Sequence, residues 1–445
     1  MTAPQAFYSL AREIDPHRTA LGAFEALATD PVFFWDDPES NFRLAGLGSA
    51  WQHVSTDGDR RMDEVSAAAS ALFDSIERHG DGAGGGPRLV GGLAFAGEPG
   101  PPPGPGINTW ESFPAAAFVL PSITLERKGG RAWITSVVPL SAAAPDEARA
   151  AIEKWVRRLG QSRPASRPLP STSRPLPDPN DEDTFRSLVK QAVADVESGR
   201  LAKVVAARSA QVDGAAESWR IIDVLRHRYP TCVTYAVFRG RSVFLGASPE
   251  LLVELQSRRV STNAVAGTAV RGIDDHADVR LENRLRHDPK ELAEHQYVVQ
   301  GLRRGLNEAG VDLAAPSELE IVKLANVQHL SSPVTGRAPR GTGILDLVAA
   351  VHPTPAVAGL PRKASLDWLA ANESLDRGWY AGPVGFVDPN LEGSFRVALR
   401  CALLKDGRAR LFAGAGIVAG SLPERELAET NAKLRAMLDA LRGGQ

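Results

Sequence analysis

The sequence has few cysteines and no long apolar run. Only Cys232 and Cys401 are present among its 445 residues, which is too few for a disulfide framework or a cysteine-based zinc site. No stretch approaches the roughly 20 apolar residues that a membrane-spanning helix needs. Residues 1–20 lack a basic segment followed by an apolar one, so no secretory signal is expected. We therefore expect a cytoplasmic protein, in a reducing compartment, that does not bind a membrane.

The chain also lacks an excess of charge of either sign. It carries 51 Lys and Arg residues against 53 Asp and Glu residues, for a formal net charge of −2. Nucleic acids are recognised by strongly basic surfaces, so no nucleic-acid partner is expected. Apolar residues make up 43% of the chain and charged residues 23%, as in ordinary globular proteins.

The composition divides the chain into three parts. Residues 1–160 contain short apolar runs typical of strands, and they form an amino-terminal portion with few chemical signals. Residues 161–181 are rich in Ser, Arg and Pro, which predicts a solvated connector or long loop. This stretch either divides two domains or is an insertion that crosses one. Residues 182–445 contain sharper helix and strand signals, and we expect the chemistry there.

A strand, a glycine-rich turn and a helix are predicted near the carboxyl end. Residues 408–413 form the predicted strand and residues 414–421 the turn. Ser421 and Glu424 fit a capping box, and Pro423 suits the first helical turn, where its missing N–H is harmless. We therefore expect free backbone N–H groups beside the start of this helix.

Three charged residues, Glu426, Glu429 and Lys433, lie on one stripe of this helix. Two carboxylates one turn apart, beside free N–H groups, would suit Mg²⁺ together with an anionic ligand. The alternative is a solvated helix face with charge pairs three and four residues apart.

Two ionisable residues interrupt apolar, strand-like segments. Lys203 lies in the run 201–208, where a lysine either extends to solvent at the strand edge or is buried and used as a base. Glu250 follows a proline at the end of an apolar strand and precedes more apolar residues. Its carboxyl group is expected to be partly buried. Burial raises the pKa of a carboxyl group, which suits a general acid.

Another helix is predicted to begin at Asp288, which caps it, with Pro289 at its first position. Glu291 is expected to reach back to the helix start, and this capping role is a sufficient explanation for it. Glu294 lies one turn further on and has no such role. It is therefore the better candidate for a metal ligand.

Taken together, these segments resemble the chorismate-utilising enzymes, the group that contains the anthranilate, aminodeoxychorismate, salicylate and isochorismate synthases. The resemblance covers residues 180–442 motif by motif and is looser over the first 160 residues. The motifs occur in the family's order: KVVAAR (203–208), GASPE (246–250), AGT (266–268), EH (294–295), HPTP (352–355) and GAGIV (414–418). The resemblance implies an α/β (α+β) fold of two stacked, mostly antiparallel sheets flanked by helices, as in anthranilate and aminodeoxychorismate synthases.

The resemblance also implies a site in which chorismate is the substrate and Mg²⁺ the cofactor. Glu294 and Glu426 would hold the ion, with Glu429 nearby, and the ion would grip the ring carboxylate. Lys203 would activate the attacking water and Glu250 would protonate the leaving hydroxyl. The substrate-binding positions implied are Gly267, Thr268, His352, Ala356, Tyr380, Arg400, Gly414, Ala415, Gly416 and Lys433. His352 could equally be a partner of backbone groups.

Two positions narrow the choice among the enzymes of this family. Ammonia-using relatives carry a glutamine where this chain has Lys203, so its lysine favours water as the nucleophile. Salicylate synthases carry a threonine at the position of Ala356 and release pyruvate. The resemblance therefore implies an isochorismate synthase that feeds menaquinone or siderophore biosynthesis, works as a monomer and needs no glutaminase subunit. The alternatives are a salicylate synthase, a glutaminase-dependent large subunit, or a ligand-binding relative without turnover.

Overall fold

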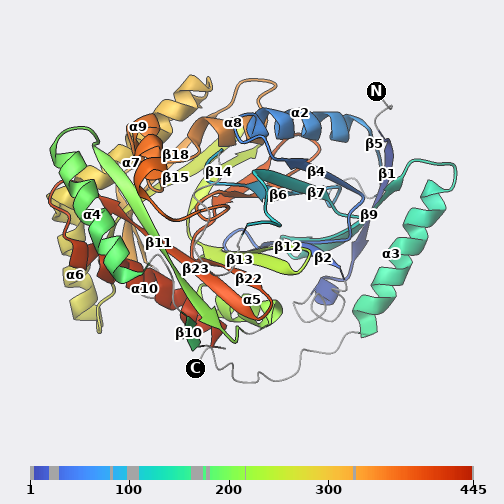
Figure 1. Ribbon diagram of the computed structural model, residues 1–445. Helices are drawn as coiled ribbons and strands as arrows, with labels where there is room; N and C mark the ends of the chain where they lie inside the picture. The colour runs from blue at the N-terminus through green and yellow to red at the C-terminus, as the bar shows by residue number, and fades with distance from the viewer. Residues whose placement is uncertain are drawn as a thin grey trace.

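Two large β-sheets stacked on one another form the body of the computed structural model (Figure 1). The structure describes residues 5–19, 30–80, 84–97, 110–161, 174–176, 181–215, 217–323 and 327–442. All strand pairs in these residues are antiparallel except β1 (Phe7–Ile14) with β5 (Ile76–Gly80), which is parallel. The predicted class of two mostly antiparallel sheets is confirmed.

The first sheet carries the two strands that later form one wall of the site, β11 and β23. Between its edges it runs in the order β10 (Arg174–Leu176), β11 (Lys203–Asp213), β23 (Arg408–Ile417), β22 (Cys401–Lys405), β13 (Ser242–Ser248), β12 (Val233–Arg239), β2 (Pro31–Asp37), β3 (Phe42–Leu47), β8 (Ile123–Lys128), β9 (Arg131–Pro139), β1 and β5. The two-residue strand β19 (Gly359–Leu360) also pairs with β11.

The second sheet runs in the order β16 (Asp312–Leu313), β18 (Val327–Arg337), β15 (Arg259–Val270), β14 (Leu251–Gln256), β21 (Gly393–Val397), β20 (Pro383–Val387), β6 (Leu89–Leu93), β7 (Ala116–Leu120) and β4 (Trp51–Ser55). The strand β17 (Glu320–Lys323) also pairs with β18. Both sheets contain strands from before and after the predicted connector 161–181. Of that connector, β10 pairs with β11, and residues 162–173 and 177–180 lie outside the described residues.

Helices cover the outer faces of the sheets (Figure 1). They are α2 (Arg61–Asp74), α3 (Ala144–Gln161), α4 (Glu182–Glu197), α5 (Ser218–Arg228), α6 (Asp275–His287), α7 (Pro289–Glu308), α8 (Ile344–Val351), α9 (Arg362–Asn372) and α10 (Pro423–Leu441), together with the 3₁₀ turn η1 (Pro16–Thr19). The helix α7 packs on β15 and β18, and α10 packs on β23 and α4. No helix within the described ranges is long and apolar enough to cross a membrane.

A cluster of aromatic rings fills the space between the sheets and ends at the site. The Trp110 ring stacks on Phe412 at 5.5 Å, and Phe412 stacks on Tyr380 at 5.3 Å between ring centres. Phe244 and Trp379 continue the cluster on its inner side, with edge-to-face contacts. Such rings stabilise the fold by their large buried area, and their stacking holds the Tyr380 ring against Phe412 of β23.

The chain passes from one sheet to the other at Arg400. The sequence predicts a single strand over 394–403, and this prediction is wrong: β21 belongs to the second sheet and β22 to the first. Between them Arg400 has φ 47°, a left-handed conformation that a residue other than glycine adopts only when its surroundings hold it there. Because of this break, the Arg400 side chain does not follow the alternation of side chains between the two faces of a strand.

The carboxyl-terminal segment differs from its prediction in two ways. Residues 414–417 are not a turn but the last part of β23. The helix α10 begins at Pro423 as predicted, but Leu422 is its N-cap and makes no side-chain cap bond. The predicted capping box is wrong, because Ser421 Oγ accepts from Val418 N at 3.2 Å and Glu424 pairs with Arg186 of α4 at 2.9 Å.

Candidate active site

Lys203 enters the protein interior at the start of β11. Its side chain is fully buried, and its ammonium nitrogen lies 2.9 Å from Glu294 Oε1 on α7. The alternative in which this lysine extends to solvent at a strand edge is therefore wrong. A buried ammonium needs a partner of opposite charge, and the neighbouring glycine makes room for it: a Cβ on Gly416 would lie 2.3 Å from Glu294 Oε1 and 3.0 Å from Lys203 Cε.

An enclosed pocket with about 70 Å³ of space for water opens beside this ion pair. Its wall comes from β11, β15, β23, α7, α10 and the segments around residues 250, 356, 380 and 400. Most of the predicted site residues line it: Glu250, Gly267, Thr268, Glu294, Ala356, Tyr380, Arg400, Gly414, Gly416, Glu429 and Lys433. Residues from eight separated stretches of sequence therefore meet around one space.

Glu250 is the buried acid of this pocket. It lies between β13 and β14, where its backbone N–H donates to Ser248 Oγ at 3.2 Å. Burial raises the pKa of its carboxyl group to about 7, although the positive charges of Lys203, Arg400 and Lys433 oppose the shift. A carboxyl group with such a pKa is partly protonated near neutral pH, so it can donate a proton.

Four glutamates from two helices are here called the glutamate cluster: Glu291 and Glu294 on α7, and Glu426 and Glu429 on α10. Glu294 and Glu429 line the pocket, whereas Glu291 and Glu426 lie beside them without lining it. Lys290 Nζ donates to Glu426 Oε1 at 3.1 Å, and Lys433 Nζ donates to Glu429 Oε1. Burial, followed by repulsion from Glu429, raises the pKa of Glu426. The cluster therefore concentrates negative charge that its own lysines only partly offset.

Glu291 belongs to this cluster, although its prediction as a helix cap is wrong. Asp288 alone caps α7, by accepting from the backbone N–H groups of Lys290 and Glu291. Glu291 Oε2 instead accepts from Thr268 N at 2.8 Å. Burial and the negative charge of Glu294 raise the pKa of Glu291 to about 7. Its spacing of three residues from Glu294 was a signal in the sequence, because it places both carboxylates on one face of the helix.

The open edge of β23 replaces the expected glycine turn as a source of free backbone groups. The neighbouring strand β22 pairs with β23 only between Arg408 and Leu411. Beyond it, Gly414 O accepts from Lys433 Nζ at 2.8 Å, so the backbone of Gly414 faces the pocket. Strand alternation turns Gly416 the same way and turns the N–H of Ala415 toward β11. An anion at this edge would meet N–H groups of both glycines and the Lys433 ammonium.

Arg400 and Tyr380 add polar groups to the apolar part of the lining. Tyr380 is buried and Arg400 is half-buried, and their removal from water lowers the pKa of Arg400 and raises that of Tyr380. Arg400 stays cationic, since its ordinary pKa is far above neutral, so it offers a second positive charge for an anionic substrate.

Two histidines differ from expectation. His329 was not predicted from the sequence, yet it lines the pocket and its Nδ1 lies 3.0 Å from Thr268 Oγ1. Burial lowers its pKa to about 3, so it is a neutral imidazole. His352 is not among the lining residues. Its Nε2 is 3.0 Å from the carbonyl oxygen of Phe95, as in the alternative reading of a backbone partner.

The chemistry of the glutamate cluster fits Mg²⁺, which prefers hard oxygen ligands. Within the described residues, no three acidic, cysteine or histidine side chains converge closely enough to hold a metal ion as they stand. The reason is visible in the ion pairs: the ammonium of Lys203 lies against Glu294 and that of Lys290 against Glu426. A divalent ion would replace these contacts with stronger ones, and Glu294 and Glu426 would be its holders.

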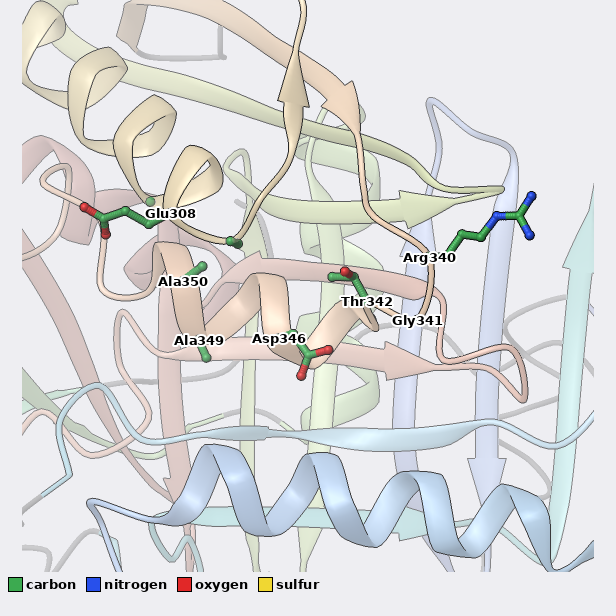
Figure 2. Close-up of a pocket in the computed structure, with 9 residues that line it drawn as sticks. Glu308, Arg340, Gly341, Thr342, Asp346, Ala349 and Ala350 are labelled. Carbon is green, nitrogen blue, oxygen red and sulfur yellow. The ribbon is translucent and has the colours of Figure 1, made fainter.

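Another hollow, of about 650 Å³, lies at the far end of α7, against α8 (Figure 2). Short side chains such as Ala349 and Ala350 line it, with Glu308 and Asp346 at its margin. It is wide open and contains none of the residues that sequence analysis selected. The enclosed pocket is therefore the better site for chemistry.

Comparison with known proteins agrees with this geometry. A family model described as chorismate binding enzyme matches residues 2–442. The salicylate biosynthesis isochorismate synthase of Pseudomonas aeruginosa is 38% identical over 439 residues, which cover 96% of this chain and 89% of that protein.

Two solved structures share the fold. MenF, the menaquinone-specific isochorismate synthase from Escherichia coli, matches with a TM-score of 0.78 at 24% identity, over 99% of this chain and 95% of that chain. Anthranilate synthase component I from Streptococcus pneumoniae matches with a TM-score of 0.70 at 22% identity, over 89% of this chain and 92% of that chain. The predicted anthranilate synthase-like fold is thus confirmed. The chain belongs to the chorismate-binding enzymes and, within them, is an enzyme of the isochorismate synthase family.

Proposed function

We propose that this enzyme is a Mg²⁺-dependent isochorismate synthase, which adds water at C2 of chorismate as the C4 hydroxyl leaves. The single observation that carries the proposal is the pairing of a buried amine with a buried, raised-pKa carboxyl group beside one pocket. Lys203 and Glu250 are close enough for the lysine charge to oppose the rise in the Glu250 pKa. An aminating enzyme would not need such a base, since ammonia is already a nucleophile.

The residues divide the reaction between them. Lys203 would act in its neutral amine form, after its ammonium has lost a proton, and would take a proton from the attacking water as the water oxygen bonds to C2 and the ring double bonds shift. Glu250 would give its proton to the C4 oxygen, which leaves as water. One water enters and one leaves, so the net change is an isomerisation. The proton held by Lys203 must return to Glu250, directly or through solvent, before the next turnover.

Binding of a dianionic substrate next to four glutamates requires positive charge. A Mg²⁺ ion held by Glu294 and Glu426 would supply that charge and attract the ring carboxylate. The second carboxylate would lie against the backbone N–H groups of Gly414 and Gly416 and the Lys433 ammonium, with Arg400 and Tyr380 beside it. Thr268 and Gly267 lie on the facing side, where β15 bulges and Gly267 adopts φ 77°.

Ala356 supports release of the isomer over its breakdown. It lines the pocket with only a methyl group, where the resemblance to salicylate synthases would require a threonine hydroxyl. We propose that the enzyme stops at isochorismate, for menaquinone or siderophore synthesis, and acts as a cytoplasmic monomer without a glutaminase subunit. The two buried, free cysteines are consistent with a reducing compartment.

The test is incubation of the purified chain with chorismate and Mg²⁺, with isochorismate and pyruvate measured in the same samples. We expect isochorismate without stoichiometric pyruvate, with no added amine or glutaminase. Chelation should abolish turnover and added Mg²⁺ should restore it. Stoichiometric pyruvate would favour the salicylate synthase, and anthranilate-type products with ammonia would favour an aminating enzyme.

A further inference from the structure

The strand that carries Lys203 has one edge that is only partly covered by other strands. On the edge away from β23, β19 pairs with Lys203 and Val204, and β10 pairs with residues 211–213. In the described part of the chain no strand pairs with the edge between them. Two side chains cover part of this gap: Val205 O accepts from Arg377 Nη2 at 2.6 Å, and Ala207 N donates to Glu373 Oε2 at 2.9 Å.

These two side chains form a buried ion pair, here called the Arg377–Glu373 pair. The guanidinium and the carboxylate meet side by side, with Nη2 and Oε2 2.8 Å apart and a second bond from Nε to Oε1. Only 4% and 3% of the two side chains are exposed. Arg377 Nη1 also donates to Val357 O at 2.8 Å. Burial of an ion pair costs free energy unless geometry and hydrogen bonds are nearly complete, and here they are.

The groups that the guanidinium holds belong to three different walls of the pocket. Val205 lies on β11 two residues after Lys203, Val357 follows Ala356, and the ring centre of Tyr380 lies 6.0 Å from the guanidinium carbon. On its other side the guanidinium lies 4.4 Å from the Phe95 ring. A single planar group therefore sets the spacing between the strand of the base and the segment that faces the substrate.

We propose that Arg377 and Glu373 are positioning residues that fix the segment Ala356–Val357 against the Lys203 strand, and thereby place the base for reaction. The proposal rests on the proposed function of Lys203. Neither side chain lines the pocket, so neither is a catalytic residue. A lysine could not replace Arg377, because a single ammonium cannot reach two carbonyl groups and both carboxylate oxygens in one plane.

The size of the expected effect follows from the demands of proton transfer. A base must stand within hydrogen-bond distance of the water it activates. A misplacement of about 1 Å by a distant change can cost about 10²-fold in rate. Loss of the Arg377–Glu373 pair should therefore lower kcat far more than it raises KM, because the groups proposed to bind the substrate carboxylates lie on β23, α7 and α10, outside the segments that the pair holds.

The experiment compares variants of the whole enzyme that remove the pair with one that removes an equivalent carboxylate elsewhere. The double variant Glu373→Met/Arg377→Met replaces both charges with unbranched apolar side chains, and buried pairs often tolerate replacement by apolar residues. Glu373→Gln and Arg377→Lys are the single variants. The control is Glu126→Gln on β8, whose carboxylate is also 3% exposed and accepts from Arg88 at 2.9 Å, away from the pocket.

We expect the double variant to fold, with kcat about 10²-fold below wild type and KM within about threefold of it. Glu373→Gln and Arg377→Lys should each lower kcat by at least about tenfold at temperatures well below their melting midpoints, and Glu126→Gln should keep the wild-type kcat. If the double variant does not fold, the single variants carry the test.

A kcat per folded molecule within threefold of wild type in the pair variants would overturn the proposal and leave a stabilising role only. An equal loss in Glu126→Gln would overturn it as well, since the effect would then follow from any buried carboxylate. A wild-type enzyme that forms no isochorismate would instead refute the proposed function, so the two failures are distinguishable.

Discussion

Two groups of charged residues flank the same pocket, and they differ in how completely their charges are matched. In the Arg377–Glu373 pair one cation meets one anion, and the remaining donors reach the carbonyl groups of Val205 and Val357. In the glutamate cluster four carboxylates face only three ammonium groups, those of Lys203, Lys290 and Lys433. Burial, together with the negative charge of Glu294, raises the pKa of Glu291 to about 7.

This difference in charge balance distinguishes a structural ion pair from a cluster that is suited to bind a ligand. A matched pair gains nothing from a new ligand, so it can hold pocket walls at a constant spacing. An unmatched cluster lowers its free energy when a cation or a proton arrives, so it is suited to bind and release one. The Arg377–Glu373 pair is buried, the carboxylates of the glutamate cluster are between 3% and 26% exposed, and acidic residues contribute to both groups. Low exposure alone therefore does not identify the reactive group, whereas the balance of charge does.

The largest effect expected is that of Lys203→Gln, which removes the base and the partner of Glu294 together. Turnover of chorismate with water should fall by at least about 10²-fold, the usual contribution of a positioned general base. The rate of isochorismate formation at saturating Mg²⁺ measures this. Melting of the variant, followed by circular dichroism, checks that the fold is intact. A rate near that of wild type would show that this lysine belongs with the structural ion pairs.

The sequence predicted those residues whose local pattern already requires an unusual explanation. A lysine inside the apolar run of β11 and a glutamate between two apolar strands are uncommon by themselves, and both prove to be buried. The stripe of Glu426, Glu429 and Lys433 followed from the period of the helix alone. The order of the motifs then placed these residues in one family and its fold.

Residues whose neighbouring sequence already suggested an ordinary structural role were assigned wrongly or missed. Glu291 three residues after a helix cap looks like part of a capping box, and only the tertiary fold brings Thr268 N to it. Glu373 and Arg377, four residues apart, look like an ordinary helix-surface pair until β11 covers them. The sequence around Gly414 and Gly416 does not distinguish a turn from a strand. Whether their backbone groups are free depends on where the neighbouring strand β22 stops pairing, which the local sequence does not show.

Glu250→Gln sharpens the comparison by removing a buried acid that is not ion-paired in the described residues. The folded-state pKa of Glu250 is about 7, above the ordinary value of 4.5. The proton it holds therefore stabilises the folded state fully below pH 4.5, and this stabilisation is lost as the pH rises through 7. Above pH 7 the amide variant should be more stable than wild type by on the order of 3 kcal/mol.

Urea unfolding at pH 5 and pH 8 measures this difference, which should be under about 1 kcal/mol at pH 5. The reaction needs the protonated acid, so kcat of the wild type should fall as the pH rises above 7, and the variant should lose turnover at every pH. The same stability difference at both pH values would mean that Glu250 is ionised when folded, and so not the acid.

Lys290→Met gives the smallest effect and tests whether the ammonium is the resident counter-ion of the glutamate cluster. Lys290 Nζ lies 3.1 Å from Glu426 Oε1 and 3.9 Å from Glu291 Oε1, so any divalent ion must compete with it. Without this competition, Mg²⁺ should bind about tenfold more tightly, or about 1.4 kcal/mol, as measured by calorimetry without substrate.

Lys323→Met is the matched control, because Lys323 bridges Asp278 and Glu282 with a similar exposure. It should leave the affinity unchanged. Weaker binding in Lys290→Met would mean that the lysine organises the cluster for the metal, and the contrast between matched and unmatched charge would then need a different basis.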